Sequence, residues 1–113
     1  RVMQINARLL EKIAVAYQAR GIPVIVLAAP TKCELGQCYT LEDRSDAARG
    51  LLKRAVAGLP VTLVDPGDSF DSTDFWRKDA HWNAAGHRKI AQALLPAVRE
   101  ALADRPGAVP QSR

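Results

Sequence analysis

An acid and a histidine two residues apart, Asp79 and His81, are the residues of this chain best suited by type and spacing to catalysis. In an extended or turning segment, side chains at this spacing can point the same way. Asp79 can then accept the Nδ1 proton of the imidazole and leave Nε2 to act as a base. The same pair is also compatible with a metal site that includes His87, or with a carboxylate that only caps the following helix.

The residues around His81 indicate how such a pair would be held. Asn83 is expected to cap a helix, and Gly86 to let that helix pack closely on a sheet. His87 is predicted to be structural. We interpret Trp76 and Trp82 as core or rim aromatic residues, with sugar stacking as the less favoured alternative.

Ser69 lies in the string Gly67-Asp68-Ser69-Phe70, twelve residues before His81. A nucleophilic serine needs a strand-to-helix turn that presents its hydroxyl beside oxyanion donors. No apolar helix follows this string. We therefore interpret Ser69 as a chance match in a polar loop.

Acidic residues recur every three positions in the same loop, at Asp65, Asp68, Asp71 and Asp74. Oxygen ligands of this kind suit calcium, but the spacing departs from the alternating EF-hand pattern. Acidic turn formers are the favoured interpretation. Neither a metal nor a cofactor is predicted.

The two cysteines, Cys33 and Cys38, stand in one short loop that Gly36 allows to turn back on itself. A disulfide closing so short a loop stabilises a fold by about 2 kcal/mol in the chain-entropy model. We favour this bridge over two free thiols, and it implies an oxidising compartment.

Three helices and two strands are predicted from hydrophobic periodicity. The first helix covers about residues 2–20 and ends at Gly21. The second covers about 43–58, with Thr40 or Asp43 as its cap, and the third 84–103, where Pro96 should kink it or shift its start. The apolar face of the first helix comprises Ile5, Leu9, Ile13 and Tyr17, and that of the third Ile90, Leu94, Val98 and Leu102. The second helix is expected to bury its apolar residues, which are Ala48, Leu51, Leu52, Ala55, Val56 and Leu59.

The strands are expected at 23–29 and 61–64. The first is a continuous apolar run, typical of a strand buried on both faces in a parallel sheet. The order α-β-α-β-α places a helix between the strands, which should therefore be parallel. Two strands leave both edges of a sheet open and give three helices too little to cover. We expect strands upstream of Arg1, or a partner chain, to complete the sheet.

Composition excludes some classes of function. The net charge of +4 comes from basic residues scattered singly, without a basic run or interleaved aromatics, so nucleic-acid binding is not predicted. No run of about 18 uncharged apolar residues is present, so no membrane span is predicted. One domain is expected over residues 1–104, followed by a disordered tail at 105–113.

The sequence resembles the C-terminal segment of the SGNH/GDSL hydrolase superfamily. The specific match is Asp79-x-His81-Trp82-Asn83-x-x-Gly86-His87, and residues 1–103 match as architecture. The acid and the histidine are two residues apart, as in the subgroup that resembles alginate O-acetyltransferases. The usual separation in the superfamily is three residues. The resemblance implies the C-terminal portion of a three-layer, flavodoxin-like α/β fold with a parallel sheet.

The family implies hydrolysis or transfer of acyl esters by a Ser-His-Asp triad. By resemblance His81 is the general base, Asp79 orients it, and an acylated carbohydrate or other small ester is the substrate. The family's serine and oxyanion donors have no counterpart in the right order, so little turnover is expected from this chain alone. A periplasmic or extracellular location is expected. Two alternatives stay open: a non-catalytic α/β module that completes its sheet with a partner chain, and a metal-binding domain built on the acidic loop and His81.

Overall fold

The computed structural model describes residues 2–36 and 45–103. The chain forms α1 (Val2–Gln18), β1 (Ile25–Leu27), α2 (Ser45–Val56), β2 (Thr62–Val64) and α3 (Ala84–Ala103). Short 3-10 helices, η1 (Lys32–Leu35), η2 (Gly67–Ser69) and η3 (Ser72–Asp74), lie in the two loops that follow the strands. The predicted order of helices and strands is confirmed.

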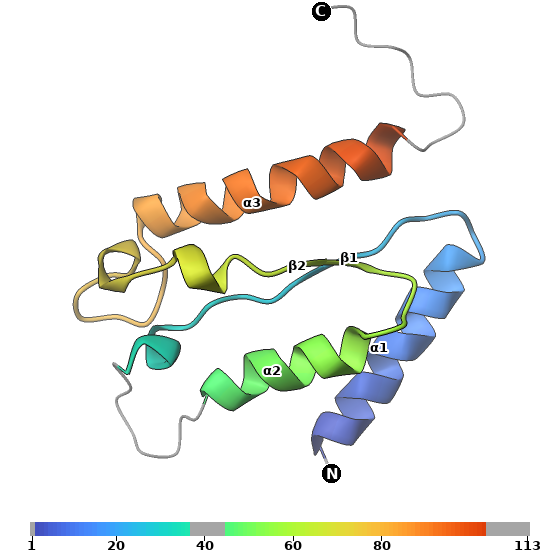
Figure 1. The fold of residues 1–113 in the computed structure, drawn as a ribbon, viewed down its shortest axis with the longest axis horizontal. Helices are drawn as coiled ribbons and strands as arrows, with labels where there is room; N and C mark the ends of the chain where they lie inside the picture. The colour runs from blue at the N-terminus through green and yellow to red at the C-terminus, as the bar shows by residue number, and fades with distance from the viewer. Residues whose placement is uncertain (1, 37–44, 104–113) are drawn as a thin grey trace, which may run out of the picture.

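The two strands pair in parallel, as predicted, with Val26 opposite Leu63 at the centre of the register. Backbone hydrogen bonds extend the pairing by one step at each end: Thr62 donates to Val24, and Ala28 donates to Val64. Both strands run the same way across Figure 1, so their following loops gather at one end of the molecule. In parallel α/β sheets this carboxyl edge is where ligands and catalytic groups collect.

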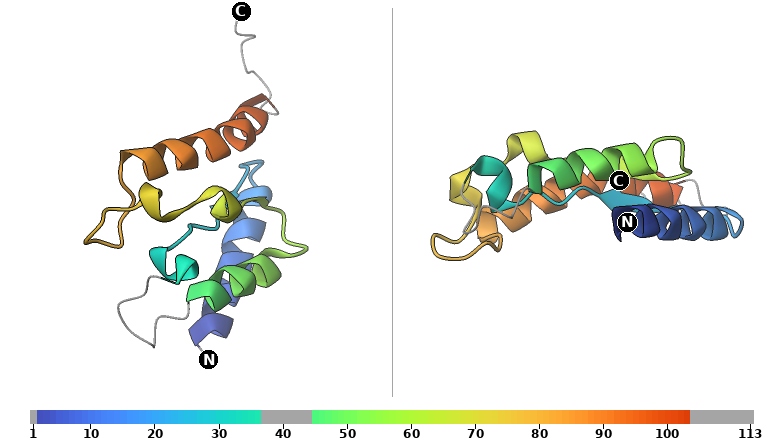
Figure 2. Two further views of the ribbon diagram at one scale, coloured as in Figure 1. Left: turned by 60° about the vertical axis from the view of Figure 1, so that its left-hand side comes forward. Right: turned by 90° about the horizontal axis from the view of Figure 1, so that it is seen from below.

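The strand pair lies between α3 and α2, as both Figure 1 and the left view in Figure 2 show. α3 contacts both strands, whereas α1 packs against α2. The edge-on view in Figure 2 shows that these elements form a thin slab. An α/β architecture is therefore present, and the described part of it is a two-stranded sheet with helices beside it.

The apolar core lies at the carboxyl end of the strands. Phe70, Phe75 and Ile90 are buried together, with Leu27, Leu35, Trp82 and Leu94 packed against them. The ring of Phe70 contacts those of Phe75 and Trp82 in tilted or edge-on geometry, an arrangement that aromatic quadrupoles favour. This core joins the loop after β2 to the first half of α3, and so it supports the predicted catalytic segment directly.

Several expectations about burial were wrong. The first strand is three residues long and only half-buried on both faces, because two strands supply too few neighbours. In α2, Val56 is buried, but Ala48 and Leu51 are exposed. Along α1 and the second half of α3 Ala14 and Ala97 are buried, but much of each apolar stripe is exposed, in line with the expectation that two strands give three helices too little to cover. The exposed side chains are Ile5, Leu9, Ile13, Tyr17, Val98 and Leu102.

α3 has the predicted bounds and continues through Pro96. Its start at Ala84 is therefore not shifted by the proline, contrary to one of the two expectations for Pro96. Three predictions fall outside the described residues: the cap at Thr40 or Asp43, the Cys33–Cys38 bridge, and the tail at 105–113. They stay predictions. No helix in the described ranges is long and apolar enough to cross a membrane.

Candidate active site

The predicted pair sits on a tight hairpin between residues 75 and 82. Phe75 and Trp82 form an antiparallel bridge. One step further out, the amide of Trp76 donates to the carbonyl of His81 at 3.0 Å. The amide of Asp79 then donates to the carbonyl of Trp76 at 3.3 Å and closes a turn over residues 76–79. The buried ring of Phe75 and the partly buried ring of Trp82 thus anchor a hairpin whose tip carries the acid and the imidazole.

Asp79 and His81 are in direct contact, as the spacing predicted. The Oδ1 atom of Asp79 accepts the backbone N–H of His81 at 3.0 Å and also meets the ring Nδ1 of His81. These contacts, the backbone N–H first and the ring second, hold the pKa of Asp79 below its ordinary value. A carboxylate on Nδ1 favours the tautomer with its proton there, which leaves the lone pair of Nε2 available to a substrate.

The imidazole is not packed into the interior. The side chain of His81 is 85% exposed and that of Asp79 52%. Nε2 of His81 is therefore accessible from solvent. Neither Asp79 nor His81 lines the cavity described below.

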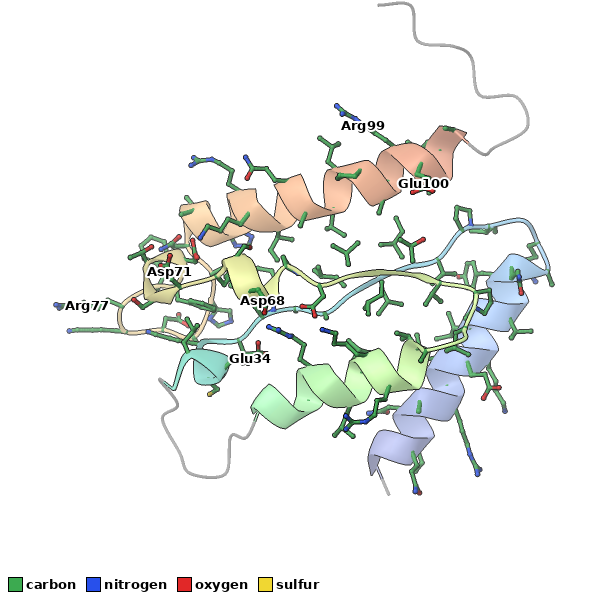
Figure 3. All side chains as sticks on the ribbon, viewed as in Figure 1. Glu34, Asp68, Asp71, Arg77, Arg99 and Glu100 are labelled. Carbon is green, nitrogen blue, oxygen red and sulfur yellow. The ribbon has the colours of Figure 1, made fainter. Side chains whose placement is uncertain are left out.

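Two side chains fasten the hairpin to the loop after β1. The indole N–H of Trp82 donates to the carbonyl of Pro30 at 3.0 Å. The ammonium of Lys32 donates to the carbonyls of Trp76 and Arg77, at 2.8 and 3.0 Å, and reaches that of Asp79 at 3.3 Å. Arg77 itself projects outward at the far end of the molecule in Figure 3. Trp82 is thus partly buried, as predicted for a core or rim aromatic residue. Trp76, for which the same was predicted, is 59% exposed.

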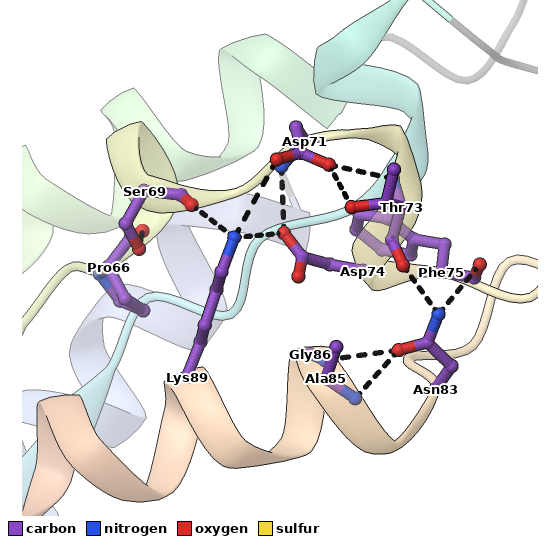
Figure 4. A network of polar contacts seen from close by, with 10 residues as sticks. All are labelled: Pro66, Ser69, Asp71, Thr73, Asp74, Phe75, Asn83, Ala85, Gly86 and Lys89. Atoms are coloured by element: carbon purple, nitrogen blue, oxygen red, sulfur yellow. Dashed lines mark hydrogen bonds and ion pairs between the residues drawn. The ribbon is translucent and has the colours of Figure 1, made fainter.

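Asn83 caps α3, as predicted, and does more. Its Oδ1 accepts the N–H groups of Ala85 and Gly86, at 2.8 and 3.2 Å, while its Nδ2 donates to the carbonyls of Thr73 and Phe75 (Figure 4). One side chain therefore fixes the start of the helix to the loop before the hairpin.

Gly86 is needed for a close approach, but the partner is not the sheet. A Cβ at this position would collide with the backbone carbonyl of Asp74 and lie 3.0 Å from the Cβ of Trp82. The expectation that α3 packs on strands at this glycine was wrong, because the η3 loop comes between them. His87, one residue on, is exposed and sets its ring edge-on to Trp82, in keeping with the structural role predicted for it.

A polar network links the loop after β2 to α3 (Figure 4). Lys89 donates to the buried carboxylate of Asp74 at 2.6 Å and to the carbonyl of Ser69 at 2.8 Å. The hydrogen bond to Asp74 raises the pKa of Lys89. The amide of Asp71 donates to Asp74, and Asp71 in turn caps η3 through Thr73. The hydroxyl and the amide of Thr73 lower the pKa of Asp71.

Ser69 occupies a structural position in this network. Its hydroxyl donates to the carbonyl of Pro66 at 2.7 Å, and no hydrogen bond joins it to His81 in the described ranges. It stands in a 3-10 helix, not at the start of a longer helix. These contacts favour the interpretation of the Gly-Asp-Ser string as a loop motif.

The other acidic residues have cationic partners near α2. Arg49 binds Glu34 and Asp68, both at 2.9 Å, and Lys53 binds Asp65 at 2.6 Å. Burial alone would raise the pKa of Asp65, but Lys53, the Gly67 amide and Arg49 together hold it below its usual value. No group of three or more potential metal ligands occurs within the described ranges.

A cavity of about 480 Å³ lies beyond the carboxyl ends of both strands, between η1, α2 and η2. Pro30 and Thr31 line it from the loop after β1, and Gly67 and Asp68 from the loop after β2. Glu34 and Asp68, both labelled in Figure 3, also line it, and Arg49 is their common partner.

The SGNH hydrolase-like domain of the acetyltransferase AlgX is the family description that matches this chain, over residues 2–112. This match places the α/β domain in the hydrolase-like and acetyltransferase class. The chain belongs to the SGNH hydrolase-like AlgX family, as the sequence resemblance predicted. Comparisons with curated proteins and with solved structures give no significant match.

Sequence reasoning found the pair and its cap but missed the residues that hold them. Asp74 and Lys89 are fifteen positions apart, and Lys32 and Asp79 forty-seven, so no local periodicity links them. The one available signal was a lysine two residues after the proline that ends a strand. A cation at that place faces the loops of the carboxyl edge.

Proposed function

We propose that this domain supplies the general base of an acyl-ester hydrolase or O-acyltransferase acting on carbohydrate esters. The supporting observation is the contact between Asp79 and the Nδ1 side of His81, on an exposed hairpin in a chain of the AlgX family. His81 is the base and Asp79 the residue that orients it. The coarse class follows from the family, whereas the roles of the two residues and the carbohydrate substrate are our proposal.

In the proposed reaction Nε2 of His81 carries every proton, while Nδ1 stays in contact with Asp79. Nε2 takes the proton of a serine hydroxyl as its oxygen bonds to the ester carbonyl carbon, and the same nitrogen protonates the departing alcohol oxygen when the ester bond breaks. Asp79 stabilises the imidazolium that exists between these steps. In the second half, water or a sugar hydroxyl loses its proton to Nε2 as its oxygen bonds to the acyl carbon. The bond between the serine oxygen and the acyl group then breaks, and Nε2 returns the proton to the serine oxygen. We do not assign the serine to Ser69, because its hydroxyl is bound to Pro66.

The remaining parts of the proposal concern the setting of the domain. Further strands, from the same polypeptide or a partner chain, extend the β1–β2 pair into a three-layer parallel fold. This is supported by the apolar side chains of α1 that no described residue covers. A periplasmic or extracellular location, with Cys33 bridged to Cys38, fits the same family.

The deciding experiment is His81→Ala in the full-length protein, assayed on a chromogenic acetyl ester and on acetyl transfer to a sugar. We expect kcat to fall by at least about a hundredfold, since a positioned base contributes that much or more. Asp79→Asn should lower kcat less, with KM unchanged. His87→Ala is the matched control, because it removes a second exposed imidazole on the same segment. Activity of His81→Ala within a few-fold of the wild type would refute the base assignment.

A second function, a non-catalytic module that pairs with another chain, is favoured by one observation. Ile5, Leu9 and Ile13 lie along one face of α1 and are each about half exposed. Sedimentation of the chain at micromolar concentration tests this function. A stable dimer, together with full activity of His81→Ala, would support it in place of catalysis.

A further inference from the structure

Lys32 is buried, although it is a cation. Its residue exposure is 6%, and it shares this burial with only one other charged side chain among those whose burial is described, Asp74. A charge withdrawn from water is stabilised only if its hydrogen-bonding groups are satisfied. Asp74 meets this need with Lys89, whereas Lys32 directs its ammonium at three backbone carbonyls.

All three carbonyls belong to the turn that carries the candidate base. They are those of Trp76, Arg77 and Asp79, and the Trp76 carbonyl also closes the turn by accepting the Asp79 amide. Three carbonyl dipoles that converge on one point repel one another unless a cation lies between them. The ammonium of Lys32 is the group that lets the turn hold this shape.

The pair itself has little else to fix it in place. Asp79 and His81 are both largely exposed, and contacts between exposed groups are individually weak. The Phe75–Trp82 bridge anchors only the base of the hairpin. Lys32 reaches the tip, and it does so from the loop that follows β1, at the carboxyl edge of the sheet.

We propose that Lys32 is a positioning residue for the candidate active site: its ammonium holds the 76–79 turn in the shape that keeps Asp79 on Nδ1 of His81. The proposal deepens the proposed function and rests on it for its catalytic meaning. Lys32 does not act on the substrate. It fixes where the acid and the base sit relative to the carboxyl end of β1.

Lys89 provides a matched control, because it is a second lysine that binds a loop of the same end. It contacts Asp74 and the Ser69 carbonyl, and no described contact joins it to the 76–79 turn. Both Lys32→Met and Lys89→Met therefore remove an ammonium from oxygen acceptors: three turn carbonyls in the first, and the Ser69 carbonyl and Asp74 carboxylate in the second. Only the first is expected to disturb the pair.

The experiment measures NMR signals of His81 and amide hydrogen exchange in both variants of the chain. In Lys32→Met, exchange of the Asp79 and His81 amides should accelerate by about tenfold, the effect of losing one hydrogen bond's net stabilisation. The ¹⁵N shifts of the His81 ring should also move toward an even mixture of the two tautomers. Lys89→Met should leave these signals as in the wild type. Unchanged His81 signals in Lys32→Met, or an equal change in both variants, would overturn the proposal.

Chemical rescue separates a positioned ammonium from general packing. In Lys32→Ala, added n-butylammonium should restore slow exchange at Asp79, while tetramethylammonium at the same ionic strength should not, because it has no N–H donor. Rescue by both cations, or by neither, contradicts the role of the donor. Where Lys32→Met or Lys32→Ala does not fold, Lys32→Gln replaces it: its amide has two N–H donors and no charge for three carbonyls, so a smaller acceleration of exchange at Asp79 is expected, and wild-type exchange together with wild-type His81 signals would refute the role of the ammonium.

Activity assays of the full-length protein keep the two proposals distinguishable. Lys32→Met should lower kcat by about tenfold without changing KM, because misplacement of a base affects the transition state and not ground-state binding. Altered His81 signals with full activity of His81→Ala would sink the proposed function and leave the positioning role intact. Inactive His81→Ala with unaltered signals in Lys32→Met would do the reverse.

Discussion

The two ends of this molecule differ in how well their side chains are packed. At the polar end, which we define as Lys32 together with residues 66–87, loops are tied to one another and to α3 over the Phe70–Phe75–Ile90 core. Along α1, Ile5, Leu9, Ile13 and Tyr17 present 45–53% of their surface to solvent. Close packing is thus concentrated around the candidate active site. In contrast, α1 has an apolar face that no described residue covers.

The polar end holds its shape although the described molecule is a thin slab with two strands. Its loops do not depend on a wider sheet, because side chains bind them directly. Asn83 and the Asp74–Lys89 pair hold the loop before the hairpin to α3. Amphipathic pattern alone does not position α1 in this way, since a pattern needs a partner surface to bury it.

Gly86→Ala should lower the stability of the fold most, because it adds a methyl group where α3 lies close to the backbone of Asp74. The new methyl group would collide with the Asp74 carbonyl, a backbone atom that cannot rotate away. We expect a loss of about 3 kcal/mol in the free energy of unfolding, at the upper end for overpacking. Urea denaturation measures it.

Gly50→Ala in α2 is the control for that substitution. Its methyl group would lie 3.7 Å from the Arg54 side chain, an ordinary contact. Alanine is favoured over glycine in a helix by about 1 kcal/mol, so this variant should be neutral or more stable. Similar losses in both variants would mean that the close approach at Gly86 does not matter.

Asp74→Asn should have the next largest effect. Asparagine retains an oxygen for the Asp71 amide but removes the charge that faces Lys89. We expect a loss of about 2 kcal/mol, below the range for a fully buried pair because Lys89 is partly exposed. Asp68→Asn, which breaks the ion pair of a fully exposed carboxylate with Arg49, should cost less than about 0.5 kcal/mol in the same thermal or urea measurement.

Asn83→Ala tests whether one side chain joins the helix to the loop. It removes the cap of α3 and both donations to the Thr73 and Phe75 carbonyls. A lost cap costs about 1 kcal/mol, and the two loop contacts should bring the loss to about 1.5 kcal/mol. Asn83→Asp keeps the cap and loses the donations, so it should be intermediate. Equal stability of the two variants would show that the loop contacts contribute nothing.

Substitutions on α1 should show the opposite behaviour. Leu9→Gln exchanges a half-exposed apolar side chain for a polar one, and we expect a change of less than about 0.5 kcal/mol in the free energy of unfolding. Ile90→Ala, in the core, should cost at least about 2 kcal/mol. If Leu9→Gln were as costly as Ile90→Ala, α1 would be covered in solution, and the contrast between the two ends would fail.

The same contrast explains what the sequence could predict. The helices, the parallel pairing, the Asp79–His81 contact and the Asn83 cap all arise from local spacing, and each was predicted. The predicted burial of Ala48 and Leu51 in α2 was wrong, because an apolar stripe shows what a helix can bury and not whether a partner is present. The Lys32 and Lys89 contacts were missed for a related reason: they join residues distant in the chain, and only the folded loops bring these side chains to their carbonyls and carboxylates.

The smallest expected effect is a difference between variants of Asp65 and Asp79 in how their stability depends on pH. The pKa values of both carboxyls are lowered in the folded state. Each carboxylate therefore stabilises the fold above its unfolded pKa of about 4, and this contribution disappears as the pH falls through the lowered folded value. Asp65 is largely buried beside Lys53 and Arg49, whereas half of the Asp79 side chain is exposed, so Asp65→Asn should flatten the acid limb of the stability curve more. Urea denaturation from pH 2 to 7 compares the two variants, and a steeper limb in Asp65→Asn than in Asp79→Asn would show that solvent does not weaken the hairpin pair.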